Sequence, residues 1–188
     1  MKNAYITGYR NYELGLFSDD DPKVKGLRYF LRKREIELLD EGYDWFLFGG
    51  QLGVEYYAFD EALKLKHDYP ELQLAVMFPF ENFGEQWSEK NQMALQHYHQ
   101  AADFVGCVSK RPYTSPEQLR QHQQFLLQST KAALVVYDDE VPGKSRYFIR
   151  DAEQYAQHHD YQLMRYDLYD LQESFYSYME ENQEFLKE

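Results

Sequence analysis

The stretch Trp45-Phe46-Leu47-Phe48-Gly49-Gly50-Gln51-Leu52-Gly53-Val54-Glu55 decides the fold class of this chain. Four large apolar residues predict a buried strand, the glycines predict a tight turn, and the residues after Gly53 predict a helix with an acid in its first turn. A helix that starts directly after a strand presents backbone N–H groups at its N-terminus, and these favour an anionic group such as a phosphate. The stretch therefore predicts a site for a nucleotide-type ligand.

Alternating apolar and amphipathic segments extend this unit along the chain. Several of the apolar runs are hydrophobic on both faces, which is typical of parallel strands covered on both sides. The segments between them have helical spacing, as Val24, Leu27 and Leu31 illustrate after Pro22. The expected class is α/β, a three-layer α/β/α sandwich with a mainly parallel sheet. The expected strands are Ala4–Thr7, Trp45–Phe48, Leu72–Phe78, Asp103–Val108, Ala132–Tyr137 and Gln162–Tyr166.

The bulk properties are those of one domain, residues 1–188, whose last part is an acidic amphipathic helix over 167–188. The formal net charge of -12 argues against nucleic acid as a partner. The single cysteine, Cys107, excludes a disulfide framework. No signal peptide and no apolar run of membrane-spanning length is apparent, so we expect a cytoplasmic protein without a membrane partner.

The ends of the other strands supply further candidate ligand-binding residues, because ligands of open α/β sheets bind at the carboxyl ends of the strands. After the first strand, Thr7, Gly8, Tyr9 and Arg10 offer a hydroxyl, a close backbone approach, an aromatic ring and a planar cation. An ordinary turn with a surface arginine is an equal alternative. After the fifth strand, a glycine loop places Lys144 where a helix starts. It resembles half of a phosphate-binding loop but does not directly follow a strand, so we reject an ATPase.

The remaining candidates are an aromatic pair and a basic pair. Pro79 and Phe80 follow the third strand, where the ring of Phe80 would flank a base or simply anchor a proline turn. Lys110 and Arg111 follow the fourth strand as a local anion site or a solvated loop. The histidines that stand in pairs do not share a face, and no metal site is expected.

Taken together, five segments of the chain resemble the YpsA family of small bacterial proteins, which is assigned to the SLOG superfamily. These are Ile6-Thr7-Gly8-Tyr9-Arg10, Glu13-Leu14-Gly15, Gly49-Gly50-Gln51-Leu52-Gly53-Val54-Glu55, Arg111-Pro112-Tyr113-Thr114-Ser115-Pro116 and Val136-Tyr137-Asp138. The resemblance implies a Rossmann-like fold, a pocket for a nucleotide or ADP-ribose-like ligand, and a role in bacterial stress or cell-division control. Related LOG-type enzymes use a Pro-Gly-Gly-x-Gly-Thr-x-x-Glu motif, from which this chain departs at Phe48 and Val54.

Three functions follow as hypotheses. In the first, a regulatory protein binds a nucleotide-derived ligand through the following residues: Thr7, Gly8, Tyr9, Arg10, Gly49, Gly50, Gln51, Gly53, Glu55, Pro79, Phe80 and Lys144. In that site Glu55 would accept a ribose hydroxyl, and Tyr9 or Phe80 would stack on the base. In the second, the protein is an N-glycosidic-bond hydrolase or ribosyl-transfer enzyme in which Glu55 is the candidate catalytic group. In the third, the acidic C-terminal helix binds a protein partner; homo-oligomers are also compatible with the sequence.

Overall fold

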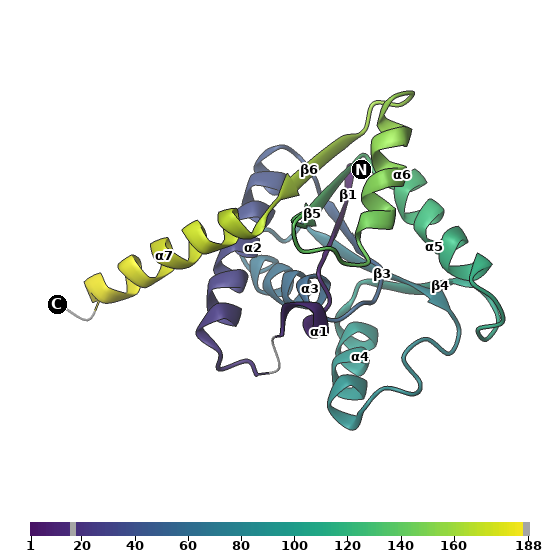
Figure 1. The fold of residues 1–188 in the computed structure, drawn as a ribbon, viewed down its shortest axis with the longest axis horizontal. Coiled ribbons are helices and arrows are strands. Elements are labelled where there is room, and N and C mark those ends of the chain that lie inside the picture. Colours follow the sequence, from purple (N-terminus) through teal and green to yellow (C-terminus); the bar gives the residue numbers. More distant parts are fainter. Residues whose placement is uncertain (16–17, 186–188) are drawn as a thin grey trace.

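The chain folds around one six-stranded sheet in the computed structural model, which describes residues 1–15 and 18–185 (Figure 1). All five pairs of neighbouring strands are parallel. The strands are β1 (Asn3–Gly8), β2 (Trp45–Phe48), β3 (Gln73–Phe80), β4 (Phe104–Ser109), β5 (Ala132–Val136) and β6 (Gln162–Tyr166). The predicted α/β sandwich with a parallel sheet is thus confirmed, and the fold is Rossmann-like.

The order of the strands across the sheet is β4-β3-β2-β1-β5-β6. From β1, the strands β2, β3 and β4 are added in sequence on one side. The chain then crosses back, and β5 and β6 are added on the other side of β1. The topological switch point lies between β1 and β5, where the connections leave in opposite directions and open a crevice at the carboxyl ends of the strands. Register pairs Gly8 with Val136 at this point.

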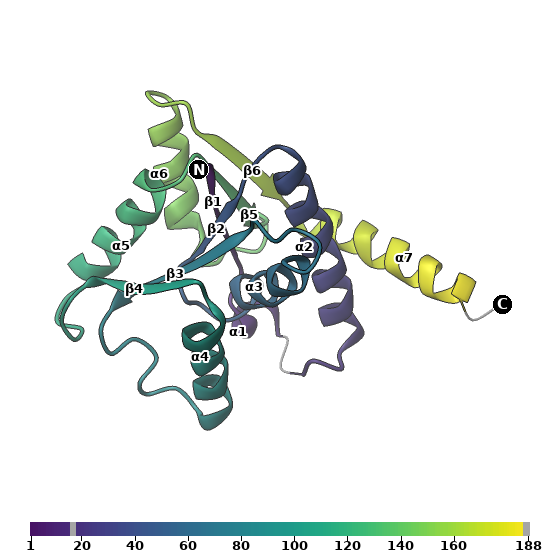
Figure 2. The same ribbon diagram turned by 180° about the vertical axis from the view of Figure 1, so that it is seen from behind.

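Helices cover both faces of the sheet, because right-handed crossovers in opposite directions place their helices on opposite faces (Figures 1 and 2). One layer holds the helices that connect β1 to β4, and the other holds the two that follow β4. The first layer contains α2 (Pro22–Asp40), α3 (Val54–Leu65) and α4 (Glu89–Ala101). The second contains α5 (Glu117–Gln128) and α6 (Arg146–Ala156). The short helix α1 (Asn11–Leu14) lies at the carboxyl end of β1.

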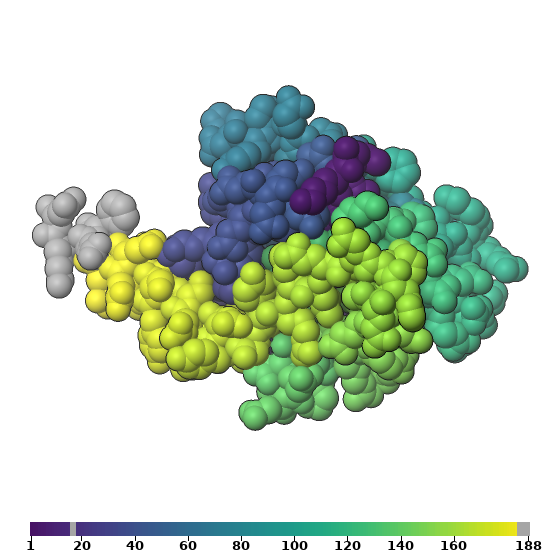
Figure 3. Space-filling view, turned by 90° about the horizontal axis from the view of Figure 1, so that it is seen from above, coloured from purple at the N-terminus to yellow at the C-terminus, as the bar shows by residue number. Residues whose placement is uncertain are grey.

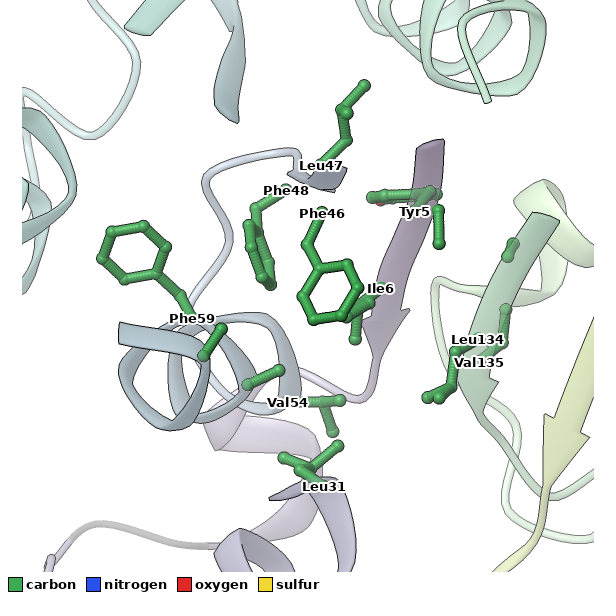
Figure 4. Close-up of a cluster of buried hydrophobic side chains, with 14 of the residues drawn as sticks. Tyr5, Ile6, Leu31, Phe46, Leu47, Phe48, Val54, Phe59, Leu134 and Val135 are labelled. Atoms are coloured by element: carbon green, nitrogen blue, oxygen red, sulfur yellow. The ribbon is translucent and has the colours of Figure 1, made fainter. Parts of the chain in front are cut away.

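Side chains of β2 alternate between the two layers, as expected for a strand covered on both faces. Phe46 and Phe48 point towards α3, while Leu47 points to the opposite face (Figure 4). The ring of Phe48 meets that of Phe59 edge to face at 5.5 Å between centroids. All five residues of β5 are buried, which explains why this strand carries no polar residue.

The long helix α2 begins where the sequence predicts it. Pro22 occupies the first turn, and the side chain of Asp21 accepts a hydrogen bond from the backbone N–H of Lys23. A proline costs nothing at this position because the first N–H groups of a helix have no intrahelical partner. Val24, Leu27 and Leu31 are all buried against the domain.

The C-terminal helix α7 (Leu168–Phe185) packs along α2 and extends beyond the sheet (Figures 1 and 3). The Phe175 ring would lie 2.6 Å from a β-carbon at Gly26, so the two helices approach closely at this glycine. Tyr29 donates a hydrogen bond to Glu181 further along. Residues 186–188 of the predicted C-terminal segment lie outside the described residues. Among the described residues, no helix is both long and apolar enough to span a bilayer.

The third strand is longer than predicted. We expected it to end at Phe78, with Pro79 and Phe80 in the following loop, but β3 continues to Phe80, which pairs with Ser109 of β4. The ladder contains no pair at Pro79, in line with the missing N–H of proline. A proline is tolerated here because it stands at the end of the strand.

Candidate functional site

The glycine turn between β2 and α3 depends on two positive backbone angles. Gly50 has φ +89° and Gly53 has φ +99°, a region that other residues rarely adopt. A β-carbon at Gly53 would lie 2.5 Å from the backbone N of Asn11 and from the carbonyl oxygen of Tyr9. The turn after β2 and the turn after β1 are therefore in direct backbone contact, which explains the glycine at position 53.

Some of the backbone N–H groups at this turn are used within the protein. The Gly49 N–H donates to Oε1 of Glu55, and the Val54 N–H donates to the carbonyl oxygen of Tyr9 at 3.0 Å. These N–H groups fix the two turns relative to each other. The cations that could bind an anion come from elsewhere in the site, as described below.

Glu55 is buried beneath the strand ends, where it holds three groups together. Oε2 accepts a hydrogen bond of 3.1 Å from Thr7 Oγ1 and a longer one of 3.5 Å from the hydroxyl of Tyr5. Oε1 accepts from Gly49. The carboxylate of the third helix thus ties the carboxyl end of β1 to the start of the glycine turn. Glu55 is 1% exposed, and the two hydroxyls that donate to it, those of Thr7 and Tyr5, lie between its carboxylate and the cavity described below.

Two titratable side chains flank the backbone of Gly49. A β-carbon there would lie 3.0 Å from Cε1 of His122 and 3.4 Å from Oε1 of Glu55. Burial raises the pKa of Glu55 to about 7, although Arg10 and the three donors oppose the shift. Burial lowers the pKa of His122 to about 4, against the hydrogen bond between Nε2 and the carbonyl oxygen of Met77. His122 is therefore neutral at pH 7, with Nε2 as its donor.

A cationic wall stands beside this network at the topological switch point. The guanidinium of Arg10 donates to the carbonyl oxygen of Gly8 (3.2 Å) and to Ser145 Oγ (2.9 Å). Ser145 Oγ in turn donates to the carbonyl oxygen of Gly8 at 2.9 Å. Lys144 is held by its backbone N–H, which donates to Glu13. In the part of the chain that the structure describes, no salt bridge joins Arg10 or Lys144 to a carboxylate.

These groups line a cavity of about 350 Å³, which we call the switch-point cavity. Its volume is in the range of pockets that hold small molecules. Four of the residues predicted as ligand-binding are brought together in its lining: Thr7, Arg10, Gln51 and Lys144. Of the described residues that line the cavity, none is acidic, and two are permanent cations in a chain of net charge -12.

The structure places the other predicted residues outside this lining. Five of them belong to the turns and the buried network that support the lining: Gly8, Gly49, Gly50, Gly53 and Glu55. Gly8 is closely packed, because a β-carbon there would lie 2.7 Å from the carbonyl oxygen of Val136.

Tyr9 and Phe80, the two rings expected to stack on a base, are engaged in other contacts. Tyr9 is buried and stacks on Tyr137 at 5.5 Å, and its hydroxyl bonds the backbone of Asp138 and Val141. Phe80 packs against Phe83 and Tyr113 near the end of β4. Pro79 stands beside it in β3. Neither ring lines the switch-point cavity.

Other aromatic and polar side chains take their place in the lining. Tyr12 of α1 and Tyr147 of α6 are exposed rings of the cavity, and His122 reaches it from α5. The sequence carries a signal for His122, since Gln118, His122 and Leu126 recur at intervals of four on one buried face of a helix. Tyr12 and Tyr147 have no such signal, because both are exposed and so lie outside the buried, periodic face of a helix.

The lining can recognise both charge and hydroxyl groups. Arg10 and Lys144 suit a phosphate, while the Thr7 and Tyr5 hydroxyls, whose protons are directed to Glu55, present lone pairs to a donor. Exposed tyrosine rings suit a flat ring system. Within the described residues, no group of three or more His, Cys, Asp or Glu side chains could hold a metal ion.

Comparisons with known proteins identify the family of the chain. The model of the family described as the YspA SLOG family matches residues 4–171. Each relative named below carries the name UPF0398 protein. The chain is 46% identical to one from Lactobacillus delbrueckii subsp. bulgaricus, over 93% of this chain and 94% of the relative. It is 45% identical to one from Latilactobacillus sakei (92% and 93%) and 42% identical to one from Pediococcus pentosaceus (97% and 100%). The chain therefore belongs to the YpsA family.

Proposed function

We propose that this protein is a cytoplasmic binder of a nucleotide-derived ligand and that it acts in regulation. The observation that carries the proposal is the switch-point cavity, in which Arg10 and Lys144 are the permanent charges in a protein of net charge -12. A local cationic site in an acidic protein favours a small anion over a polyanion such as nucleic acid. The position at the switch point of a parallel sheet is the usual one for such ligands.

The two sides of the cavity suit a sugar phosphate. Its phosphate would lie against the cationic wall formed by Arg10 and Lys144. Its hydroxyls would donate to Thr7 and Tyr5, whose own protons are directed to Glu55. Because Glu55 bonds three internal donors, we assign it the role of orienting these hydroxyls instead of touching the ligand. Tyr12 and Tyr147 would pack on the sugar or on a ring attached to it.

Titration calorimetry with ribose 5-phosphate, AMP and ADP-ribose tests this proposal. We expect all three to bind, and we expect Lys144→Met to weaken each by about tenfold, because a charge-assisted contact to phosphate is lost. Lys110→Met is the matched control, since Lys110 is an exposed lysine in the other basic loop and does not line the cavity. If the folded wild-type protein binds none of the three, the proposal is wrong. If Lys110→Met has the larger effect, the anion site lies at the loop after β4.

A second candidate function is cleavage of an N-glycosidic bond or ribosyl transfer. The observation in its favour is that burial brings the pKa of Glu55 to about 7, which suits a general acid or base near neutral pH. Proton transfer would pass through Thr7 or Tyr5, whose hydroxyls lie between Glu55 and the cavity. Chromatography of AMP or ADP-ribose incubated with the protein tests it. Release of free adenine by wild type and not by Glu55→Gln would support this function; no release by wild type would exclude it for these substrates.

A further inference from the structure

A second and larger cavity, of about 840 Å³, lies on the other side of the glycine turn. We call it the α4 cavity, because α4 forms one of its walls. Consecutive residues of the turn divide the two cavities: Gln51 lines the switch-point cavity, while Leu52 and Gly53 line the α4 cavity. Tyr12 of α1 lines both. The glycine turn and α1 thus lie between the two cavities, at the carboxyl ends of the strands.

The chemistry of the α4 cavity differs from that of the switch-point cavity. Its charged residues include Asp19 and Lys90, one of each sign, so it lacks the excess of cations found beside Arg10 and Lys144. Side-chain amides from α4 are prominent in its lining, including Gln96 and Gln100. A spacing of four residues places these two amides on one face of the helix. In the described ranges, no hydrogen bond within the protein engages either amide.

Aromatic rings complete the α4 cavity. Tyr12 is 56% exposed and can turn a face to either cavity. Tyr56 is held edge-on by the rings of Tyr57, His97 and Tyr98. Tyrosine faces and side-chain amides are among the groups with which proteins bind a nucleobase: the ring stacks on the base, and the amide pairs with the donors and acceptors along its edge.

We propose that the α4 cavity binds the base-bearing half of a two-part ligand whose other half, a sugar phosphate, occupies the switch-point cavity. The inference rests on the proposed function and extends it, because it names a ligand with two ring systems linked through phosphates. The linker passes from one cavity to the other at Tyr12. Gln96 and Gln100 contact the uncharged half, while Arg10 and Lys144 contact the charged half.

The test compares a ligand that fills both cavities with one that fills only the switch-point cavity. ADP-ribose is the two-part probe and ribose 5-phosphate is the one-part probe, both measured by titration calorimetry on the full chain. The variant is Gln96→Ala with Gln100→Ala, which removes two exposed amides and keeps good helix formers in α4. The matched control is Gln128→Ala, an exposed glutamine of α5 that lines neither cavity.

We expect wild type to bind ADP-ribose about tenfold or more tightly than ribose 5-phosphate, since stacking and edge contacts to a base add to the phosphate contacts. The double variant should lose most of this advantage, bind ribose 5-phosphate as wild type does, and keep the wild-type circular dichroism spectrum. The control should behave as wild type with both probes.

Two results overturn the inference while leaving the proposed function intact: equal affinity of wild type for the two probes, or an unchanged affinity of the double variant for ADP-ribose. An equal loss of affinity for both probes in the double variant also overturns it, because the sugar phosphate would then depend on α4. Failure of wild type to bind either probe refutes the proposed function, and this inference with it.

Discussion

Two glutamates of this protein are buried to the same extent but in different surroundings. Glu55, on α3, is 1% exposed and accepts hydrogen bonds from Gly49, Thr7 and Tyr5. Glu35, on α2, is 0% exposed, and neither of its carboxyl oxygens has a hydrogen-bond partner within the described residues. A buried carboxyl group is costly unless donors surround it. The three donors thus offset the cost of burying Glu55, whereas the burial of Glu35 without hydrogen bonds lowers the stability of the fold.

The pKa values of the two glutamates reflect these surroundings. Burial raises the pKa of Glu35 well above its usual value, and the nearby carboxyl of Glu61 raises it further. For Glu55 the effect of burial is opposed by Arg10 and the three donors, so its pKa rises only to about 7. Burial without donors therefore favours the protonated form of Glu35, while Glu55, with a pKa of about 7, can gain or lose its proton near neutral pH.

The largest effect is expected from removing the carboxylate of Glu55, which tests whether its hydrogen bonds stabilise the fold. Glu55→Ala leaves the Gly49 N–H and the two hydroxyls without their acceptor, so the free energy of unfolding should fall by about 3 kcal/mol or more. Urea denaturation followed by circular dichroism measures this. Glu55→Gln is the control, because its amide oxygen can still accept from Gly49, and its loss should be smaller. An equal loss of unfolding free energy in the two variants would contradict the role of the Glu55 side chain as a hydrogen-bond acceptor.

The second prediction concerns pH. The folded-state pKa of Glu55 is raised from 4.5 to about 7, so its contribution to stability is present below pH 4.5 and is lost as the pH rises through 7. The folded-state pKa of His122 is lowered from 6.5 to about 4, so its contribution is present above pH 6.5 and is lost as the pH falls through 4. Each contribution amounts to roughly 3 kcal/mol, and between pH 4.5 and 6.5 the two oppose each other.

Single variants should separate these opposing contributions. Relative to wild type, Glu55→Gln should make stability increase more steeply with pH between 4.5 and 6.5. His122→Gln, whose amide can still donate to the carbonyl oxygen of Met77, should make it increase less steeply or decrease. Urea denaturation of wild type and both variants at a series of pH values measures the slopes. Shifts of the same sign in the two variants would contradict the assignment of the two pKa values.

The third prediction tests the unsatisfied glutamate. Glu35→Met replaces a buried carboxyl with an apolar side chain of similar length and high helix propensity, so the free energy of unfolding should rise by about 2 kcal/mol at pH 7. Glu37→Met on the same helix is the matched control. It removes only an exposed ion pair with Arg34, worth about 0.5 kcal/mol. A destabilised Glu35→Met protein would show that Glu35 has a partner or a role that its surroundings do not reveal.

The architecture could be predicted from the sequence because parallel strands that are buried on both faces appear as continuous apolar runs. The runs of β2 and β5 consist almost entirely of apolar residues, and each predicted strand lies at or within a few residues of an observed one. The end of β3 was misplaced because proline is a strong loop signal. Pairing with the edge strand β4 outweighs that signal at Phe80.

The candidate site was predictable in part. Thr7, Arg10 and Lys144 meet because strand ends at a switch point converge, which the pattern of strands and helices implies. The periodicity of α5 places His122 on a buried face, but it does not show which strand ends His122 meets, because that depends on how a helix of the opposite layer packs. The sequence also could not show that Tyr9 is engaged within the protein, because its hydroxyl bonds backbone groups of Asp138 and Val141, which are distant in sequence.

The smallest expected effect on stability comes from a comparison of two glycines, Gly50 and Gly42, which have the same φ of +89°. Because they share this backbone angle, a difference between their alanine variants reports the surroundings of each glycine. A β-carbon at Gly50, in the turn that Glu55 supports, would lie 2.3 Å from the buried ring of Phe78, whereas at Gly42 nothing lies within 4 Å. Both alanine variants suffer the strain of a positive φ, about 1 kcal/mol. Gly50→Ala must also displace the ring and should be less stable than Gly42→Ala by about 1 kcal/mol, read from urea denaturation. If the two variants are equally stable, the turn can move away from Phe78, and this contact does not fix the position of the turn between the two cavities.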